Sequence, residues 1–215
     1  MNLFPSILLV AAISASSLNA QITYVDADSS NTQAVGGVPS PFFTTSVTSD
    51  NLWRFRGGFG FDVAGNNGVY EKDGASGGYG DAAKLEITVT VPLANTEYGV
   101  YVNFLSDGSS WRILAGTEQN ALALFTPTTT GVENLGLTSV PNSNRNQFRG
   151  FIANAISDAN AKIKIYIDDT GATGTSNRTW FDGVSYGPVI TPPEPESGLI
   201  TDDGVWTWFN DERAI

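Results

Sequence analysis

The chain of 215 residues contains no cysteine and no histidine. Without cysteine it can form no disulfide, no thiolate nucleophile and no zinc–thiolate site. Without histidine it has no imidazole to serve as a base or a metal ligand, and no Ser-His-Asp triad. Any catalysis would therefore depend on carboxylates, tyrosine, lysine or arginine alone.

Positive charge is also scarce. The sequence has 11 lysines and arginines against 22 aspartates and glutamates, which gives a formal net charge of −11. Nucleic-acid binding rests on lysine and arginine contacts with phosphates, so we expect no nucleic-acid partner. The balance fits a soluble extracellular protein, including one that binds cations.

Residues 1–20 have the pattern of a secretory signal peptide. An apolar run at 3–13 is followed by small and polar residues at 14–20. The run is shorter than the roughly 20 apolar residues that a membrane-spanning helix needs, so no membrane span is expected. Cleavage after Ala20 would leave Gln21 as the first residue of a secreted or periplasmic protein.

Strand patterns recur from residue 21 to residue 187, with turns between them. Alternating apolar and polar residues, as at 85–91 and 98–104, are typical of half-buried antiparallel strands. The predicted strands cover 22–25, 52–55, 85–91, 98–104, 111–115, 121–125, 148–152, 163–167 and 180–186. Residues 153–161 have room for one helical turn. About nine or ten strands predict an all-β antiparallel sandwich, with a jelly roll as the preferred topology and a monomer as the expected state.

Four prolines and two glutamates mark residues 188–198 as a semi-rigid linker. After it, residues 199–215 include the run Val205-Trp206-Thr207-Trp208-Phe209, whose aromatic and β-branched residues favour a strand. No partner strand follows in the sequence. We therefore interpret 199–215 as the truncated start of a further domain.

The end of the chain also carries a resemblance to a known group. The pattern D-D-G-x-W-x-W-F-x-D-x-R-A from Asp202 resembles the start of the β-propeller in secreted BNR-repeat proteins, which include ulvan-lyase-type polysaccharide lyases. Thr207 and the segment 210–212 depart from the usual residues of that motif. The match covers about 14 residues, and it implies a glycan-active protein whose catalytic propeller is missing from the sequence.

A second resemblance covers most of 21–186. The segments 100–104, 111–116 and 178–186 are similar to N-terminal sandwich modules of secreted marine bacterial proteins, and in architecture to jelly rolls of the carbohydrate-binding-module type. The motifs are loose, so the resemblance implies a fold more than a ligand.

Sugar binding needs flat aromatic faces with polar or charged groups beside them. Tyr101 and Asn103 alternate with Val100 and Val102, so they are predicted to face away from the core. The candidate glycan-binding residues are Arg54, Arg56, Tyr101, Asn103, Trp111, Arg112 and Trp180. For each of them, a role in the core or as a solvated charge remains the alternative.

A structural calcium ion needs several oxygen ligands. Asp26 and Asp28 follow the first strand, and Asp182 lies in the last one. In a jelly roll the first and last strands often lie close, which would bring Asp26 or Asp28 towards Asp182. These aspartates could equally cap their own turns. No cofactor is required by the sequence.

These patterns predict a secreted, non-catalytic β-sandwich that binds polysaccharide at the N-terminus of a larger glycan-active protein. Two alternatives stay open. The chain could be a fragment of a polysaccharide lyase or hydrolase whose catalytic propeller is missing, or a structural spacer or adhesion module with no sugar site.

Overall fold

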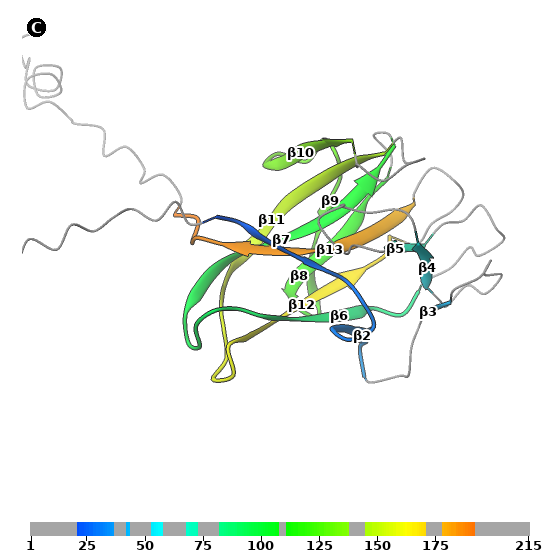
Figure 1. Ribbon diagram of the computed structural model, residues 1–215. Helices are drawn as coiled ribbons and strands as arrows, with labels where there is room; N and C mark the ends of the chain where they lie inside the picture. Colours follow the sequence, from blue (N-terminus) through cyan, green and yellow to red (C-terminus); the bar gives the residue numbers. More distant parts are fainter. Residues whose placement is uncertain are drawn as a thin grey trace, which may run out of the picture.

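The protein is built from two β-sheets packed face to face (Figure 1). The computed structural model describes residues 21–36, 42–43, 53–57, 68–72, 82–107, 111–137, 145–170 and 178–191. These residues form thirteen strands and no helix. Within them no helix is long and apolar enough to cross a membrane.

The larger sheet has eight strands in the order β10-β11-β7-β13-β5-β4-β3, with β1 pairing along β13. All its pairs are antiparallel except β3 with β4. Its strands are β1 (Thr23–Asp26), β3 (Phe42–Phe43), β4 (Trp53–Gly57), β5 (Gly68–Lys72), β7 (Glu97–Ser106), β10 (Val132–Leu137), β11 (Asn146–Ile156) and β13 (Thr179–Gly187).

The smaller sheet has five antiparallel strands in the order β2-β6-β12-β8-β9. They are β2 (Thr32–Ala34), β6 (Leu85–Thr90), β8 (Ile113–Glu118), β9 (Ala121–Phe125) and β12 (Lys162–Asp168). From β6 onward the chain crosses repeatedly between the two sheets. The predicted all-β sandwich is therefore confirmed.

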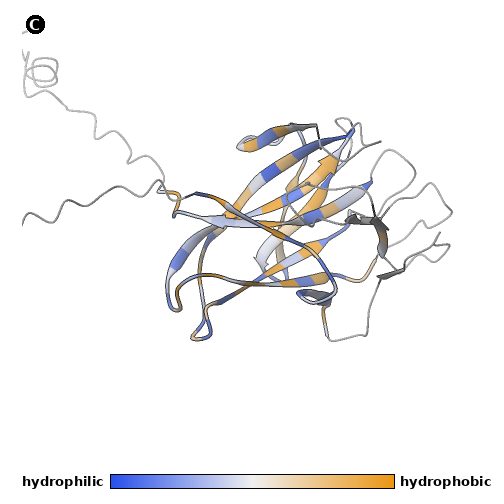
Figure 2. Ribbon diagram, viewed as in Figure 1, coloured by the Kyte–Doolittle hydropathy of each residue, from blue (hydrophilic) through white to orange (hydrophobic). Residues whose placement is uncertain are grey.

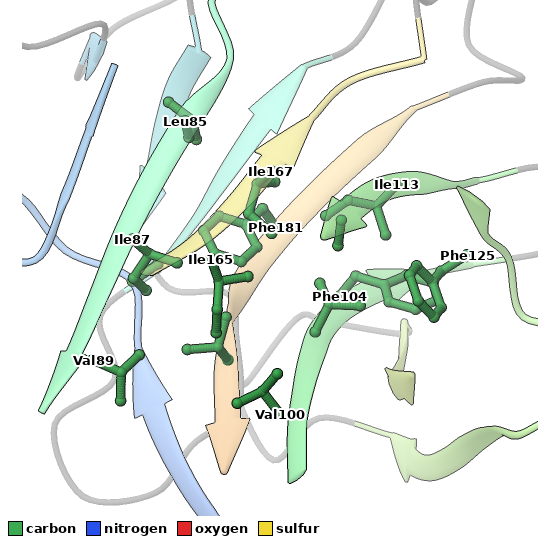
Figure 3. Packing of buried hydrophobic residues seen from close by; sticks show 14 of the residues in the cluster. Leu85, Ile87, Val89, Val100, Phe104, Ile113, Phe125, Ile165, Ile167 and Phe181 are labelled. Atoms are coloured by element: carbon green, nitrogen blue, oxygen red, sulfur yellow. The ribbon is translucent and has the colours of Figure 1, made fainter. Parts of the chain in front are cut away.

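The core fills the space between the sheets, where the apolar residues of each alternating strand meet. Figure 2 shows the change between hydrophobic and hydrophilic residues along the strands. In Figure 3 the side chains of β6 and β12 face those of β7 and β13. The largest inward-facing members include Leu85, Ile87, Phe104, Ile113, Ile165, Ile167 and Phe181, each no more than 1% exposed. Burial of such side chains, at about 1.5–3 kcal/mol each, is the main force that holds the sheets together.

The two central strands of the larger sheet are buried on both faces, which differs from the prediction for β7. Alternation at 98–104 predicted a strand with one wet face. In the structure every residue of β7 from Gly99 to Ser106 is buried, and β13 is buried except at Tyr186. The face of these strands that points away from the core is thus covered as well.

Sequence patterns also missed several elements. The strands β2, β5 and β10 and the short β3 carry no strong alternation and were not predicted. A helical turn within 153–161 was wrong, because residues 153–156 continue β11 and pair with β7. Ala153 and Ala155 lie opposite Val100 and Tyr98, so pairing outweighs any local helical preference.

The first and last strands lie side by side. Thr23 pairs with Tyr186 and Asp26 with Gly183, so β1 starts next to the end of β13. Beyond β13 the carbonyl of Pro188 lies against Gly99, where an added Cβ would approach its oxygen to 2.5 Å. The backbone of Ile190 then exchanges two hydrogen bonds with the side chain of Asn154, at 2.9 and 3.1 Å.

The predicted linker 188–198 therefore begins as a segment held against the sandwich, at least as far as Ile190. Its remainder from 192, the predicted propeller start at 199–215 and the predicted signal peptide at 1–20 lie outside the described residues.

We expect core packing to dominate stability, and two isoleucines provide a matched test. Ile165 on β12 is 1% exposed, whereas Ile156 at the end of β11 is 70% exposed. Ile165→Ala should lower the free energy of unfolding by about 2–5 kcal/mol, and Ile156→Ala by less than about 0.5 kcal/mol. Urea denaturation followed by tryptophan fluorescence measures both. Equal losses in the two variants would contradict the described packing.

Candidate functional site

Most of the predicted site residues meet on one surface, the face of the larger sheet that points away from the core. We call it the outer face. It carries Tyr101, Asn103 and Leu105 of β7, with Gln147, Arg149 and Phe151 opposite them on β11. Trp180, Asp182 and Ser185 of β13 lie on the other side of β7. The sheet thus brings together side chains from three distant parts of the sequence.

At one end of the outer face two tryptophans pack against each other. The ring centroids of Trp111 and Trp180 are 5.0 Å apart, and the two side chains form one buried cluster with Leu105. Trp111 arrives from the segment before β8, which is tied to β13 because Arg112 N donates to Arg178 O at 3.0 Å. Thr179 Oγ1 completes the link by donating to Arg112 O at 2.8 Å.

Two guanidinium groups lie over these rings. Arg145 Cζ is 4.3 Å from the Trp180 centroid and 5.2 Å from that of Trp111, and Arg178 Cζ is 5.3 Å from Trp111. We call these four residues the Trp–Arg cluster. Such cation–π contacts contribute about 0.5–2 kcal/mol each. Trp111 and Trp180 are only 2% and 1% exposed, whereas both arginines are partly exposed.

A third arginine, Arg149, lies further along the outer face, and its charge is paired with Glu133. Arg149 donates from Nε and Nη2 to Glu133 Oε2 of β10, at 3.2 and 2.5 Å. Its Cζ also lies 5.7 Å from the ring centroid of Tyr101. Burial raises the pKa of Tyr101, and the positive charge of Arg149 opposes that rise. Tyr101 therefore stays a neutral, ring-packed side chain.

The predicted direction of Tyr101 and Asn103 is confirmed, but their exposure is not. Both point away from the core, yet Tyr101 is 6% exposed and Asn103 1%. Tyr101 packs edge-on against Phe151, with ring centroids 5.5 Å apart. Asn103 Oδ1 accepts a hydrogen bond from Ser185 Oγ at 2.7 Å. The alternating pattern correctly predicted that both side chains point away from the core. It could not predict that neighbouring side chains would bury them there.

Asp182 sits at an irregularity in β13. Phe181 pairs with Phe104 and Gly183 with Asn103, so Asp182 is the extra residue of a β-bulge. Its carboxylate is fully buried and accepts a hydrogen bond from Gln147 Nε2 at 2.7 Å. A buried carboxylate needs such donors, because its desolvation is otherwise costly. Gln147 Oε1 is buried and has no hydrogen-bond partner in the described part of the chain.

The predicted approach of Asp26 to Asp182 also occurs, with Tyr24 between them. Tyr24 OH lies 3.1 Å from Asp26 Oδ1 and 3.0 Å from the carbonyl oxygen of Asp182. Burial first, and then the negative charges of Asp182 and Asp26, raise the pKa of Tyr24 far above its ordinary value of 10.0. The close fit continues at Gly183, where a Cβ would lie 2.4 Å from Val25 O.

Asp28, the third aspartate of the predicted calcium site, makes different contacts. Its Oδ1 accepts hydrogen bonds from Ser30 N, Ser30 Oγ and Asn31 N, so it closes its own turn. Across the described residues no group of three or more acidic side chains is arranged to hold a metal ion. The calcium prediction thus has two of its three residues in one place.

The remaining predicted glycan residues lie at the borders of this surface. Arg112 Nε donates to Thr170 Oγ1 at 3.0 Å beside the Trp–Arg cluster. Arg54 and Arg56 are on β4, where Arg54 pairs with Glu71, which in turn pairs with Trp180. The side chains of Arg54 and Arg56 are outside the described part of the structure.

Sequence reasoning missed five residues that shape the outer face: Tyr24, Arg145, Gln147, Arg149 and Arg178. The structure separates the two kinds of positively charged side chain. All four arginines with described side chains, at 112, 145, 149 and 178, lie on or beside this face, whereas the described lysines at 84, 162 and 164 lie on or beside the smaller sheet. Arginine suits planar and ring-stacked contacts in a way that lysine does not.

The chain matches no protein-family model, and comparisons with curated proteins and with solved structures give no match. Its function must therefore be argued from the surface described above.

The half-buried Tyr24, whose hydroxyl contacts Asp26 and Asp182, gives this surface a testable dependence on pH. In the unfolded chain Tyr24 ionises above about pH 10, but in the folded protein it stays protonated. The unfolded state then binds fewer protons, so folding stability falls as pH rises past 10, by about 1.4 kcal/mol at pH 11.

Tyr24→Phe should be less stable than the parent at pH 8 by about 1–2 kcal/mol, because it loses the hydroxyl contacts. The difference in unfolding free energy between parent and variant should narrow by about 1.4 kcal/mol at pH 11. Only the parent is destabilised there, because phenylalanine has no hydroxyl that can ionise in the unfolded chain. Urea unfolding at the two pH values gives the answer. A gap of constant size would contradict the burial of the Tyr24 hydroxyl.

Proposed function

We propose that the protein is a secreted, non-catalytic β-sandwich module, with a jelly-roll arrangement, that binds anionic polysaccharide on its outer face. The observation that carries this proposal is the Trp–Arg cluster, where two partly exposed arginines place their guanidinium groups over buried indole rings.

The covered rings favour an anionic glycan over a neutral one. A neutral sugar would stack on a free aromatic face, but Trp111 and Trp180 are buried and Arg145 and Arg178 lie against them. Both arginines are partly exposed, although Arg145 Nε and Arg178 Nε are themselves buried, so any contact with a ligand falls to the outer nitrogens. Their planar donors suit carboxylates and sulfates, and stacking on an indole fixes the plane in which they are presented.

The position of the arginines supports an extended ligand. Arg149 lies in β11, whereas Arg145 immediately precedes β11 and Arg178 immediately precedes β13. Side chains on one face of a strand repeat every two residues, so Arg145, just before β11, and Arg149 within it are about 13 Å apart along the strand direction. A polymer with a repeated negative charge could contact more than one of them. Arg145 and Arg178 thus place positive charge locally on the outer face of a chain whose overall charge is −11.

Secretion and the role within a larger glycan-active protein belong to the same proposal. The sandwich would act as the polysaccharide-binding part, and the propeller suggested by residues 202–215 would supply any lyase or hydrolase activity. The calcium ion, if bound, would be structural and would use Asp26 and Asp182.

Affinity electrophoresis of the full chain in gels containing alginate, ulvan or xylan, at two salt concentrations, tests the proposal. We expect retardation by the anionic polymers that weakens as salt rises, because exposed charges are screened beyond about 10 Å at 0.1 M. Arg145→Ala and Arg178→Ala should each reduce affinity about tenfold, if one charge-assisted contact is lost.

Lys164→Ala is the matched control, since it removes one positive charge from the smaller sheet and should leave retardation unchanged. Arg145→Lys separates charge from geometry, because it keeps the charge but loses the planar donor group. Melting temperatures identify any variant that fails to fold. Equal retardation in xylan at both salt concentrations would favour stacking of a neutral glycan, and no retardation in any gel would leave the spacer interpretation.

A further inference from the structure

A second surface, on the smaller sheet, has the features of a separate ligand site. A cleft of about 410 Å³ lies where the turn before β2 meets the strands β6 and β12. Its size falls within the range of about 300–1,000 Å³ that is usual for small-molecule sites. The lining residues are Ser29, Ser30, Asn31, Thr32, Gln33, Thr88, Thr90 and Lys162. We call this site the β2 cleft.

One wall of the cleft is a turn that is fixed by its own hydrogen bonds. Asp28 Oδ1 accepts from Ser30 N, Ser30 Oγ and Asn31 N. Asn31 donates from Nδ2 to Asp26 O at 2.7 Å, and its Oδ1 accepts from Asp28 N and Thr32 Oγ1. Thr88 N then donates to Asn31 O at 2.9 Å, which joins the turn to β6. The wall is therefore held in place without any ligand.

The other polar groups of the cleft are not used by the protein. Ser29 Oγ, the Gln33 amide, Thr88 Oγ1, Thr90 Oγ1 and Lys162 Nζ have no hydrogen-bond or ion-pair partner within the described ranges. Gln33 lies opposite Glu86, and Lys162 opposite Thr90. Three hydroxyls, one amide and one ammonium group are thus free to contact one ligand.

Charge distinguishes the β2 cleft from an ordinary wet surface. The other two described lysines are paired, Lys84 with Asp168 at 3.6 Å and Lys164 with Glu86 at 2.9 Å. Lys162 has no such pair, and no carboxylate lines the cleft. The nearby Asp28 and Asp158 already accept backbone N–H groups through Oδ1. Lys162 is thus the described lysine whose charge no ion pair offsets.

We infer that the β2 cleft binds a single sugar unit that carries one anionic group, either a carboxylate or a sulfate. The anionic group contacts Lys162 Nζ, and the ring hydroxyls exchange hydrogen bonds with Ser29, Gln33, Thr88 and Thr90. The lining has no aromatic or aliphatic platform, so an apolar ligand would gain little there. The site is independent of the outer face and of the polysaccharide bound there.

The test uses the full chain labelled with ¹⁵N and titrated with glucuronate, glucose 6-sulfate and glucose. We expect glucuronate, glucose 6-sulfate or both to shift the backbone amides of residues 29–33, 88, 90 and 162. Glucose should bind about fivefold more weakly than the anionic sugar, as expected for one partly exposed ion pair. The two anionic arms show which group the cleft prefers.

Variants then assign the binding to the cleft. Lys162→Gln should reduce the affinity for the anionic sugar about fivefold, to that for glucose, and Thr88→Val should weaken all three sugars. Lys164→Gln, two residues further along β12 on the same face, should leave all three affinities unchanged. Arg145→Ala should also leave these titrations unchanged, so failure of the outer-face proposal is seen separately in the polysaccharide gels. Equal binding of glucose and both anionic sugars, or shifts confined to other amides, would overturn the inference.

Discussion

The pairing of β7 with β13 is the constraint on which the rest of the structure depends. Phe104 opposite Phe181 anchors the core on one face, and Leu105 with Trp180 anchors the outer face on the other. Because both strands are buried on both faces, each polar side chain on them must find a partner. Asp182 meets Gln147, and Asn103 meets Ser185. The pairing of β7 with β13 thus determines where polar partners are needed on these strands and on β11.

The fold could be predicted where a strand has one clear apolar side. Residues 85–91, 121–125 and 163–167 alternate or carry β-formers, and each corresponds to a strand of the smaller sheet. The short β2 could not be predicted, since Thr32-Gln33-Ala34 has too few residues to show a period. Alternation of apolar and polar residues also shows only which face of the sheet a residue lies on. Whether that face is wet depends on segments elsewhere in the chain, which is why Tyr101 and Asn103 were expected to be exposed.

The candidate site was predictable in its residue types but not in its contacts. Trp111 and Trp180 were both selected, yet their mutual packing requires the segment before β8 to lie against β13. The role of Arg145 depends on that packing, so it could not be found from local sequence. The β2 cleft was missed for a different reason. Serine, threonine and asparagine at 29–32 are typical turn residues, and nothing in the sequence distinguishes an ordinary turn from one that lines a cleft.

The antiparallel contact between β1 and β13 affects how the module would respond to force. Thr23 and Tyr186 pair at the same end of the sandwich, and Pro188 leaves that end beside Gly99. Tension applied between the start of β1 and the segment after β13 would load the four β1–β13 residue pairs one after another, from Thr23 towards Asp26. A strand loaded in this way opens like a zipper, at lower force than one sheared along its length. The edge strand β1 would therefore separate before the core, leaving the Tyr24 hydroxyl and the Asp182 bulge as the first contacts exposed to water.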